Sequence, residues 1–233
     1  MTQEKIGNEC DNLKKKIARE ITLTGIKINF KDKPITMLDL LGDGTGAKYY
    51  AENHPISDMY LIERNKKRFN LVTDSHGYNY LPIQYSSETT FHAYRIKLQK
   101  YLESSKAPNV DVFNLDLCSF FHIDETKDSP VSLLKTIFEK RIINNNGLLF
   151  FTFQLKGKGV YYYRKKKVVL QDMNSVIDYI NQIAISYGIK LEILPLKSTY
   201  NSKEGQSDKR GNSVMMNAGV KVKYKDDNIT NEI

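Results

Sequence analysis

The chain has 233 residues, of which 40% are hydrophobic and 27% are charged. This length suits one α/β domain and is short for two, and the composition excludes a wholly disordered chain. The formal net charge of +8 favours polyanionic partners such as RNA or DNA, although a lysine-rich solvated surface would give the same value.

The sequence carries no signal for secretion, membrane insertion or metal binding. No apolar run approaches the roughly 20 residues that span a membrane, and residues 1–11 lack the apolar core of a signal peptide. The two cysteines, Cys10 and Cys118, cannot form a disulfide framework, and neither they nor the four histidines have metal-ligand spacing. We therefore expect a cytoplasmic protein without a metal site.

Predicted helices and strands alternate along the chain. Leu13, Ile17, Ala18 and Ile21 recur at helical spacing, which predicts an amphipathic cap helix within residues 1–30. The elements expected after it are strand 35–41, helix 47–53, strand 59–62, helix 66–75, strand 78–85, a helix carrying Phe91, Tyr94, Leu98, Tyr101 and Leu102, strand 110–117, helix 130–141 with Ser129 as N-cap, strand 147–153, a helix from Met173 to a C-cap at Gly188, and strands 190–195 and 214–224.

This order predicts an α/β fold. Alternating strands and helices favour a mostly parallel sheet of seven strands with helices on both faces, a three-layer αβα sandwich. The last two strands, joined by a polar loop over 198–212, predict an antiparallel C-terminal hairpin at one edge. We assign the main domain to residues 31–225 and a flexible tail to 226–233.

A glycine-rich turn follows the first predicted strand, with the sequence Gly42-Asp43-Gly44-Thr45-Gly46. Glycines allow positive φ angles and close approach of the backbone to a ligand, and the N–H groups of the next helix offer donors to a polar group. In open α/β sheets the ligand lies at the carboxyl end of such a strand. The turn therefore predicts a cofactor site, although an ordinary tight turn would use the same residues.

The stretch from Met37 to Gly46 resembles the first motif of class I S-adenosylmethionine-dependent methyltransferases, a strand that closes in Asp-hydrophobic-Gly-x-Gly-x-Gly. Two further features are similar: an acid, Glu63, ends the second strand, and Asp116 lies at the end of the fourth. The resemblance implies a Rossmann-like methyltransferase domain with S-adenosylmethionine as cofactor. The residues it places at that cofactor are Asp39, Gly42, Asp43, Gly44, Gly46, Glu63, Arg64 and Asp116.

Within this resemblance, Glu63 would accept hydrogen bonds from the two ribose hydroxyls of the cofactor. Asp39 departs from the family pattern, because it lies three residues before Gly42 and Leu40 occupies the usual place of the acid. Either the turn carries one extra residue, or Asp39 is shifted out of contact with the cofactor and Asp43 substitutes for it.

Asp116 is the candidate catalytic residue, since the end of the fourth strand faces the transferred methyl group in this family. Its carboxylate would orient or deprotonate an acceptor amine or hydroxyl, or would only contact the cofactor. Cys118 lacks the preceding proline of nucleophilic cysteines in cytosine methyltransferases and is expected to be an inert thiol. Phe120 and Phe121 could stack a nucleobase, but core packing is the simpler interpretation.

Residues 156–167 combine glycines, tyrosines and cations, which supply stacking surfaces and phosphate contacts. A second basic loop over 203–210 could frame the same entrance. A solvated β-hairpin with a lysine-rich face explains the pattern equally well. The predicted nucleic-acid-binding residues are Lys156, Lys158, Tyr162, Arg164, Lys165 and Lys166.

A dinucleotide-binding oxidoreductase is the main competing enzyme class, but its fingerprint, Gly-x-Gly-x-x-Gly, places the third glycine one residue later than Gly46. The function predicted from the sequence is methyl transfer to nucleic acid. The alternatives are methylation of a small molecule or protein, and a non-catalytic module that keeps the fold and binds a nucleic-acid or protein partner.

Overall fold

The architecture comes from a computed structural model, which describes residues 13–42, 44–73, 89–121, 123, 126, 128–155, 160–163, 166–169, 172–201 and 214–225. Its helices are α2 (Leu13–Phe30), α3 (Thr45–Asn53), α4 (Lys66–Thr73), α5 (Leu98–Glu103), α6 (Pro130–Glu139) and α7 (Met173–Ser186). Its strands are β1 (Ile35–Leu40), β2 (Ile56–Ile62), β3 (Thr90–Tyr94), β4 (Val110–Phe120), β5 (Ile143–Leu155), β6 (Val160–Tyr163), β7 (Lys166–Val169), β8 (Ile189–Asn201) and β9 (Val214–Tyr224).

Seven strands form one sheet in the order β3-β2-β1-β4-β5-β9-β8, and β6 and β7 form a separate hairpin. β1 to β5 pair in parallel, whereas β9 runs antiparallel to both β5 and β8. The predicted α/β fold, mostly parallel with an antiparallel C-terminal hairpin, is confirmed. The strand order reverses at β1, so the ligand crevice of such a sheet is expected at the carboxyl ends of β1 and β4.

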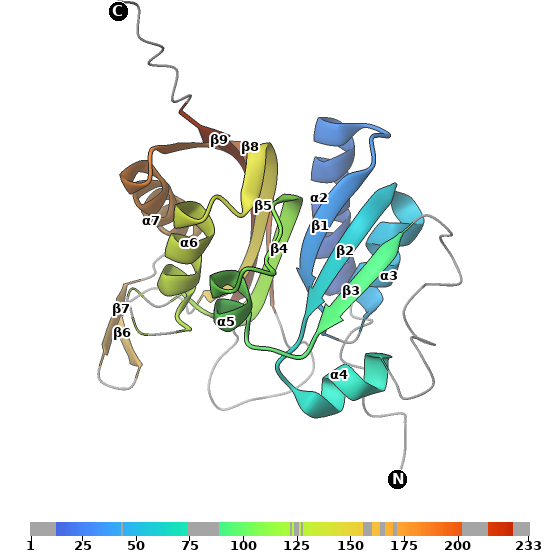
Figure 1. Cartoon of the computed structure of the whole chain (residues 1–233). Helices are drawn as coiled ribbons and strands as arrows, with labels where there is room; N and C mark the ends of the chain where they lie inside the picture. The colour runs from blue at the N-terminus through green and yellow to red at the C-terminus, as the bar shows by residue number, and fades with distance from the viewer. Residues whose placement is uncertain are drawn as a thin grey trace, which may run out of the picture.

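Helices cover both faces of the sheet (Figure 1). α5, α6 and α7 pack on one face, and α2 and α3 pack on the other, each over its own buried hydrophobic cluster. Among the described residues, no helix combines the length and the apolar character needed to cross a bilayer. The boundary between a cap over residues 1–30 and a domain over 31–225 stays a prediction, and Leu23 and Ile26 of α2 lie in the second cluster.

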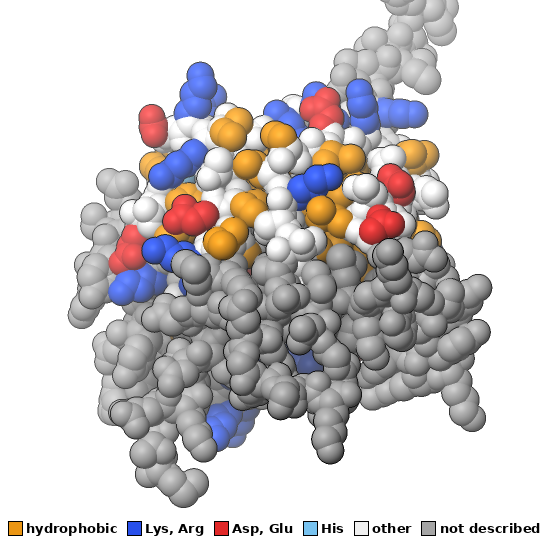
Figure 2. Space-filling view, turned by 180° about the vertical axis from the view of Figure 1, so that it is seen from behind, with side chains coloured by type: hydrophobic (Ala, Val, Ile, Leu, Met, Phe, Trp, Pro, Cys, Tyr) orange, Lys and Arg blue, Asp and Glu red, His pale blue; other side chains and the backbone are white. Residues whose placement is uncertain are grey.

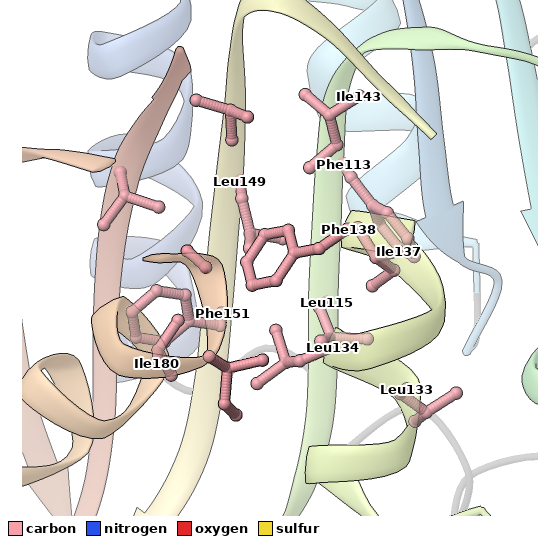
Figure 3. Close-up of a cluster of buried hydrophobic side chains, with 14 of the residues drawn as sticks. Phe113, Leu115, Leu133, Leu134, Ile137, Phe138, Ile143, Leu149, Phe151 and Ile180 are labelled. Atoms are coloured by element: carbon pink, nitrogen blue, oxygen red, sulfur yellow. The ribbon is translucent and has the colours of Figure 1, made fainter. Parts of the chain in front are cut away.

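The face under α6 and α7 is packed with large apolar side chains (Figure 3). Side chains alternate along each strand, so every second residue of β4 and β5 points to this face. The side chains that meet there from β4, β5 and α6 are at most 1% exposed: Phe113, Leu115, Leu149, Phe151, Leu134, Ile137 and Phe138.

The ends of α6 and α7 follow from local sequence. The Oγ of Ser129 accepts a hydrogen bond from Ser132 N at 3.1 Å, and Pro130 occupies the first helical position, so the predicted N-cap is confirmed. Gly188, with φ 71°, lies just after the last turn of α7, where a left-handed residue ends a helix, as predicted.

α2 approaches the sheet closely through a glycine. A Cβ atom at Gly25 would lie 2.6 Å from the ring of Phe150 on β5, and a Cβ at Gly219 of β9 would lie at the same distance from that ring. Phe150 is therefore held between two glycines on two elements. The predicted apolar stripe of α2 needs one correction, because Ile17 is 45% exposed and the buried side of the helix includes Thr22.

Two predicted elements differ from the structure. Phe91 and Tyr94, predicted on a helix, lie on β3, which pairs in parallel with β2, and the helix α5 begins only at Leu98. The apolar residues of β3 and α5 have helical spacing in the sequence, although they belong to a strand, a turn and a short helix. The strand predicted at 78–85 lies outside the described residues. Ser198, predicted to open a loop, lies within β8 and pairs with Asn217 of β9.

Candidate active site

The turn after β1 contains two glycines with positive φ angles. Gly42 has φ 52° and Gly44 has φ 81°, a region in which any side chain is strained. Gly44 N donates to Leu41 O at 2.7 Å, and Leu41 N donates to Ile62 O at the end of β2 at 3.1 Å. Since α3 begins directly afterwards, the N–H groups of its first turn lie at the carboxyl end of the sheet.

Asp39 lies beside this turn and is 3% exposed. Its Oδ1 accepts hydrogen bonds from Leu40 N at 2.8 Å and from Asn114 Nδ2 of β4 at 3.0 Å. Its Oδ2 lies against Gly46, where a Cβ atom would be 3.4 Å away. The extra residue, Leu40, therefore leaves the carboxyl group of Asp39 next to the glycine turn. Its contact with a cofactor stays a prediction.

Burial raises the pKa of Asp39 from 3.8 to about 7. The hydrogen bond from Leu40 opposes this rise, the negative charge of Asp116 adds to it, and Asn114 and Arg19 oppose it. Near neutral pH the carboxyl group is therefore divided between its two protonation states. A cation bound beside it would favour the charged form.

Tyr50 of α3 and the first half of α2 cover this acid. Tyr50 is 2% exposed, and its pKa is raised well above the ordinary value by burial and further by the charge of Asp39. Thr22 of α2 lies beside the Tyr50 hydroxyl and lowers this pKa, as does the charge of Arg19, one turn earlier on α2. α2 therefore brings polar and cationic groups to the acidic end of the sheet.

Glu63 follows β2 directly, at the carboxyl end of the strand that pairs with β1. Its backbone N–H donates to Tyr94 O of β3 at 3.1 Å, and its Oε1 accepts from Asn65 N at 2.7 Å. The neighbouring Arg64 is exposed. Because Leu40 is paired with Ile62, Glu63 and the glycine turn leave the sheet side by side. Their assignment to a cofactor stays a prediction.

A row of polar side chains continues across the carboxyl half of the sheet. Asp116 pairs with Thr152 of β5, Thr152 with Asn217 of β9, and Asn217 with Ser198 of β8; we call these four residues the polar row. They point to the α2 face, because the residues next to them along the strands, such as Leu115, belong to the opposite cluster. Asn217 Nδ2 donates to Thr152 Oγ1 at 3.3 Å.

The predicted nucleic-acid segment is described only in part. Lys156, Lys158, Arg164 and Lys165, like Asp43 of the glycine turn and the basic loop 203–210, lie outside the described residues. Tyr162 of β6 and Lys166 of β7 are described by their backbone alone, in an antiparallel hairpin where Tyr162 pairs with Lys167 and Tyr163 with Lys166.

Three residues at or just after the end of β4 were candidates for chemistry from the sequence: Cys118, Phe120 and Phe121. The side chain of Cys118, like that of Phe120, lies outside the described part. Phe121 is wholly buried and makes edge-to-face contacts with Phe153, at a centroid distance of 4.9 Å, and with Tyr179, at 5.8 Å. Phe121 therefore packs in the core and has no free face on which a base could stack.

Within the described part of the chain, no group of three or more histidine, cysteine, aspartate and glutamate side chains could hold a metal ion. His92 lies 3.0 Å from the Asp58 carboxylate and stacks on Tyr60 at the edge of the sheet. His54 bonds to Lys33 O at 3.1 Å. Both histidines have structural partners away from the glycine turn.

The site includes residues that the sequence analysis did not single out as candidates, among them Asn114, Tyr50, Thr152 and Asn217. Asn114 carried a signal, since it lies two positions before Asp116 and thus on the same face of the strand. Asn217 also carried one, as a polar residue in the otherwise apolar start of the last strand. Tyr50 and Thr152 gave no signal, because only the folded sheet brings them to Asp39 and Asp116.

The sequence matches no protein-family model, and no curated protein matches it either. Solved structures are similar in fold. Trm1 from Pyrococcus horikoshii, solved with S-adenosyl-L-methionine, has a TM-score of 0.58 at 14% identity, over 90% of this chain and 55% of Trm1. TehB from Haemophilus influenzae has a TM-score of 0.54 at 13% identity, over 88% of this chain and 62% of TehB.

A third similar structure is the N-methyltransferase NodS from Bradyrhizobium japonicum, solved with S-adenosyl-L-homocysteine, with a TM-score of 0.52 at 11% identity over 92% of this chain and 90% of NodS. The chain therefore has the fold of class I S-adenosylmethionine-dependent methyltransferases. Identities this low establish the fold alone. The chain also spans less than two thirds of TehB and of Trm1.

Proposed function

We propose that this protein is an S-adenosylmethionine-dependent methyltransferase that acts on nucleic acid in the cytoplasm. One observation carries the cofactor part of the proposal: a buried carboxyl group, that of Asp39, lies against the third glycine of a turn at the point where the strand order reverses. That position is where ligands bind in open α/β sheets.

The residues present fit this cofactor. S-adenosylmethionine carries two cationic groups and a ribose with two hydroxyls, and the site offers the carboxyl groups of Asp39 and Asp116 and, after β2, that of Glu63. Burial raises the pKa of Asp39, and a cationic group of the cofactor beside this carboxyl group would lower that pKa and favour the charged form. The positive φ angles of Gly42 and Gly44 give the turn a path that leaves its backbone accessible to a ligand.

When bound, S-adenosylmethionine supplies a methyl group on a positively charged sulfur, and the carbon–sulfur bond breaks with its electron pair remaining on sulfur as the acceptor forms the new bond. Glu63 would hold the ribose by accepting its hydroxyl hydrogen bonds. Asp39, oriented by Asn114, would hold a cationic group of the cofactor. Asp116 would orient the acceptor and take the proton that the acceptor loses. Alignment contributes much of the rate in such a reaction.

The choice of nucleic acid as acceptor is supported by the net charge of +8 and by the cation-rich and tyrosine-rich segment 156–167. Viewed from the α2 side, the described surface instead shows basic, acidic and hydrophobic side chains interspersed (Figure 2). Nucleic acid is therefore favoured by the composition of the chain and by the segment after β5, and not by the described surface on the α2 side. Methylation of a small molecule or protein is the competing outcome.

The first test is calorimetric titration of the protein with S-adenosylmethionine, S-adenosylhomocysteine and NAD. We expect micromolar binding of the first two and none of NAD. Glu63→Ala should weaken cofactor binding about tenfold to hundredfold, since a charged hydrogen-bond acceptor is lost. Glu139→Ala, an exposed glutamate at the end of α6, is the matched control and should leave the affinity unchanged. Absence of S-adenosylmethionine binding would refute the enzyme and leave a non-catalytic binding module.

The acceptor class is tested by the salt dependence of binding to RNA and DNA oligonucleotides. For a protein that contacts phosphates, the logarithm of the binding constant falls linearly with the logarithm of the salt concentration. A flat dependence would favour a small-molecule or protein acceptor.

A further inference from the structure

Four cations lie close together on the surface just after β2. Arg64 comes two residues after the last residue of the strand, and Lys66, Lys67 and Arg68 form the first turn of α4. All four side chains are exposed, and residues 64–73 include no acid. Because β2 ends here, these cations lie at the carboxyl end of the sheet, beyond which α4 is seen in Figure 1.

A fifth cation reaches the same place from the neighbouring strand. Glu63 N donates to Tyr94 O of β3 at 3.1 Å, so the two chain segments leave the sheet side by side. Arg95 follows Tyr94 directly and is exposed. We call these five cations the basic corner: Arg64, Lys66, Lys67, Arg68 and Arg95. Among the described residues, none of the five forms an ion pair with an aspartate or glutamate.

The helix that carries most of the basic corner is fixed to the rest of the fold. Val72 is 2% exposed, and both it and Phe69 pack in the hydrophobic cluster on the α2 face. Asn65 Oδ1 accepts hydrogen bonds from Lys67 N at 2.9 Å and from Arg68 N at 3.1 Å, which caps the helix. The cations of α4 are therefore presented on an anchored and capped element.

The charges of this first turn are unfavourable for the helix itself. The N-terminal end of a helix carries a partial positive charge, so acids stabilise it and cations oppose it. α4 has three cations and no acid in its first turn. Sequences break such local rules mainly at functional sites. A bound anion would supply the missing negative charge, and it would contact the side chains, because Asn65 already accepts from the N–H groups of Lys67 and Arg68.

The composition of the basic corner fits a chain of phosphates. Arginine binds phosphate with two parallel hydrogen bonds and lysine binds it as a point charge, and cations spread over two segments suit several phosphates better than a single anion. Surfaces that bind membranes combine cations with apolar side chains that enter the bilayer. The exposed large hydrophobic residues of the described part all lie outside the corner: Ile17, Ile28, Ile185 and Ile193.

We infer that the basic corner binds the phosphate backbone of the nucleic acid and positions it beside the cofactor site without reading its sequence. Arg64 directly follows Glu63, the residue assigned to the cofactor ribose, so the phosphate chain passes the rim of that site. Since nucleic acid is the acceptor only under the proposed function, this role of the corner rests on that proposal and adds the surface that holds the acceptor.

The experiment measures binding of the full chain to fluorescein-labelled RNA and DNA single strands of about 20 nucleotides, longer than a usual binding site. Fluorescence anisotropy is recorded over a series of KCl concentrations. Each cation that contacts a phosphate of a single strand adds roughly 0.7 to the slope of log affinity against log salt. The triple variant Lys66→Gln, Lys67→Gln and Arg68→Gln should therefore lower the slope by about 2, and Arg95→Gln by roughly 0.7, equally for different sequences.

The matched control removes the same charge elsewhere. Lys27→Gln, Lys31→Gln and Lys33→Gln change three exposed lysines that come before β1, at the amino end of the sheet, and should leave the slope unchanged. The triple variant of the corner should melt at the same temperature as the unmodified protein or higher, because cations leave the first turn of α4. Its affinity for S-adenosylhomocysteine should change less than about twofold, as for surface substitutions.

Contrary results are distinguishable. An unchanged slope in the corner variants, or an equal fall in the corner and control triples, would show that the basic corner does not contact the phosphates, while the proposed function stands. Binding to phosphatidylserine–phosphatidylcholine vesicles that the corner triple loses, with RNA and DNA binding intact, would assign the corner to a membrane surface. Failure of the proposed function is seen in the unmodified protein alone, which would then bind no S-adenosylhomocysteine, or neither RNA nor DNA.

Discussion

The two faces of the sheet use the same strands in different ways. Toward α6 and α7, β4 and β5 present Phe113, Leu115 and Phe151, which are wholly buried. Toward α2, the same strands begin with apolar residues such as Phe150 and end in polar ones such as Asp116. The comparison shows that stability and chemistry are divided between the two sides of single strands, because adjacent residues point in opposite directions.

If the face under α6 serves stability alone, truncating Phe138 should have the largest effect on folding and none on the site. Phe138→Ala removes a side chain that is 1% exposed, and we expect the free energy of unfolding to fall by about 3–5 kcal/mol. Urea denaturation measures this loss, and calorimetry on the folded fraction measures cofactor affinity. A marked drop in affinity would show that the two faces are coupled.

Asp39 is a buried acid on the α2 face of the sheet, and there we expect a substitution to raise stability and to weaken cofactor binding. The pKa of Asp39 is about 7 in the folded chain against an ordinary 3.8, so the folded state retains a proton that the unfolded state has released. Stability should therefore fall as pH rises from about 4 to about 7, and the deficit should be complete above pH 7.

Asp39→Asn should remove this pH dependence and stabilise the protein at pH 8 by up to about 4 kcal/mol, while weakening cofactor binding. The same variant should match the unmodified protein near pH 4. Urea denaturation at both pH values, with calorimetric titration, tests the trade-off. A less stable variant at pH 8 would mean that Leu40, Asn114 and Arg19 together hold the charged form.

The smallest effect is expected at the N-cap of α6, on the face of the sheet that serves stability. Ser129→Ala removes the side chain that accepts from Ser132 N at the start of α6, and should cost about 1 kcal/mol of unfolding free energy. Thermal denaturation measures the loss. Unchanged stability would indicate that Pro130 and the packing of α6 suffice to begin the helix.

Much of the fold could be predicted because the central strands of the sheet and the helices that cover them have strong apolar patterns. β1 is apolar except for Thr36 and Asp39, the first half of β9 is apolar except for Asn217, and the N-cap at Ser129 begins α6 as its sequence indicates. β3 could not be predicted, since Phe91 and Tyr94 on an edge strand happen to continue a helical spacing into α5. Pairing with β2 decides its structure, and that contact is not local.

The candidate site, like the fold, could be predicted from the sequence only in part. The glycine turn and Glu63 follow from their places directly after strands, where sequence patterns are informative. The partnership of Asp39 with Asn114 depends on the register between β1 and β4, and that of Thr152 with Asn217 on the insertion of β9 beside β5. A sequence indicates that a C-terminal hairpin exists but does not say which of its strands joins the sheet.

The ring of Phe150, held between Gly25 and Gly219, has a consequence for how the chain can vary. A methyl group at either glycine would collide with the same edge of the ring, because a Cβ atom at Gly25 would lie 3.0 Å from Cε1 of Phe150 and one at Gly219 would lie 2.6 Å from it. These three positions should therefore change together during evolution. A larger residue on α2 or β9 should be accompanied by a smaller one at position 150, so relatives of this protein can be recognised by that compensation even where little else is shared.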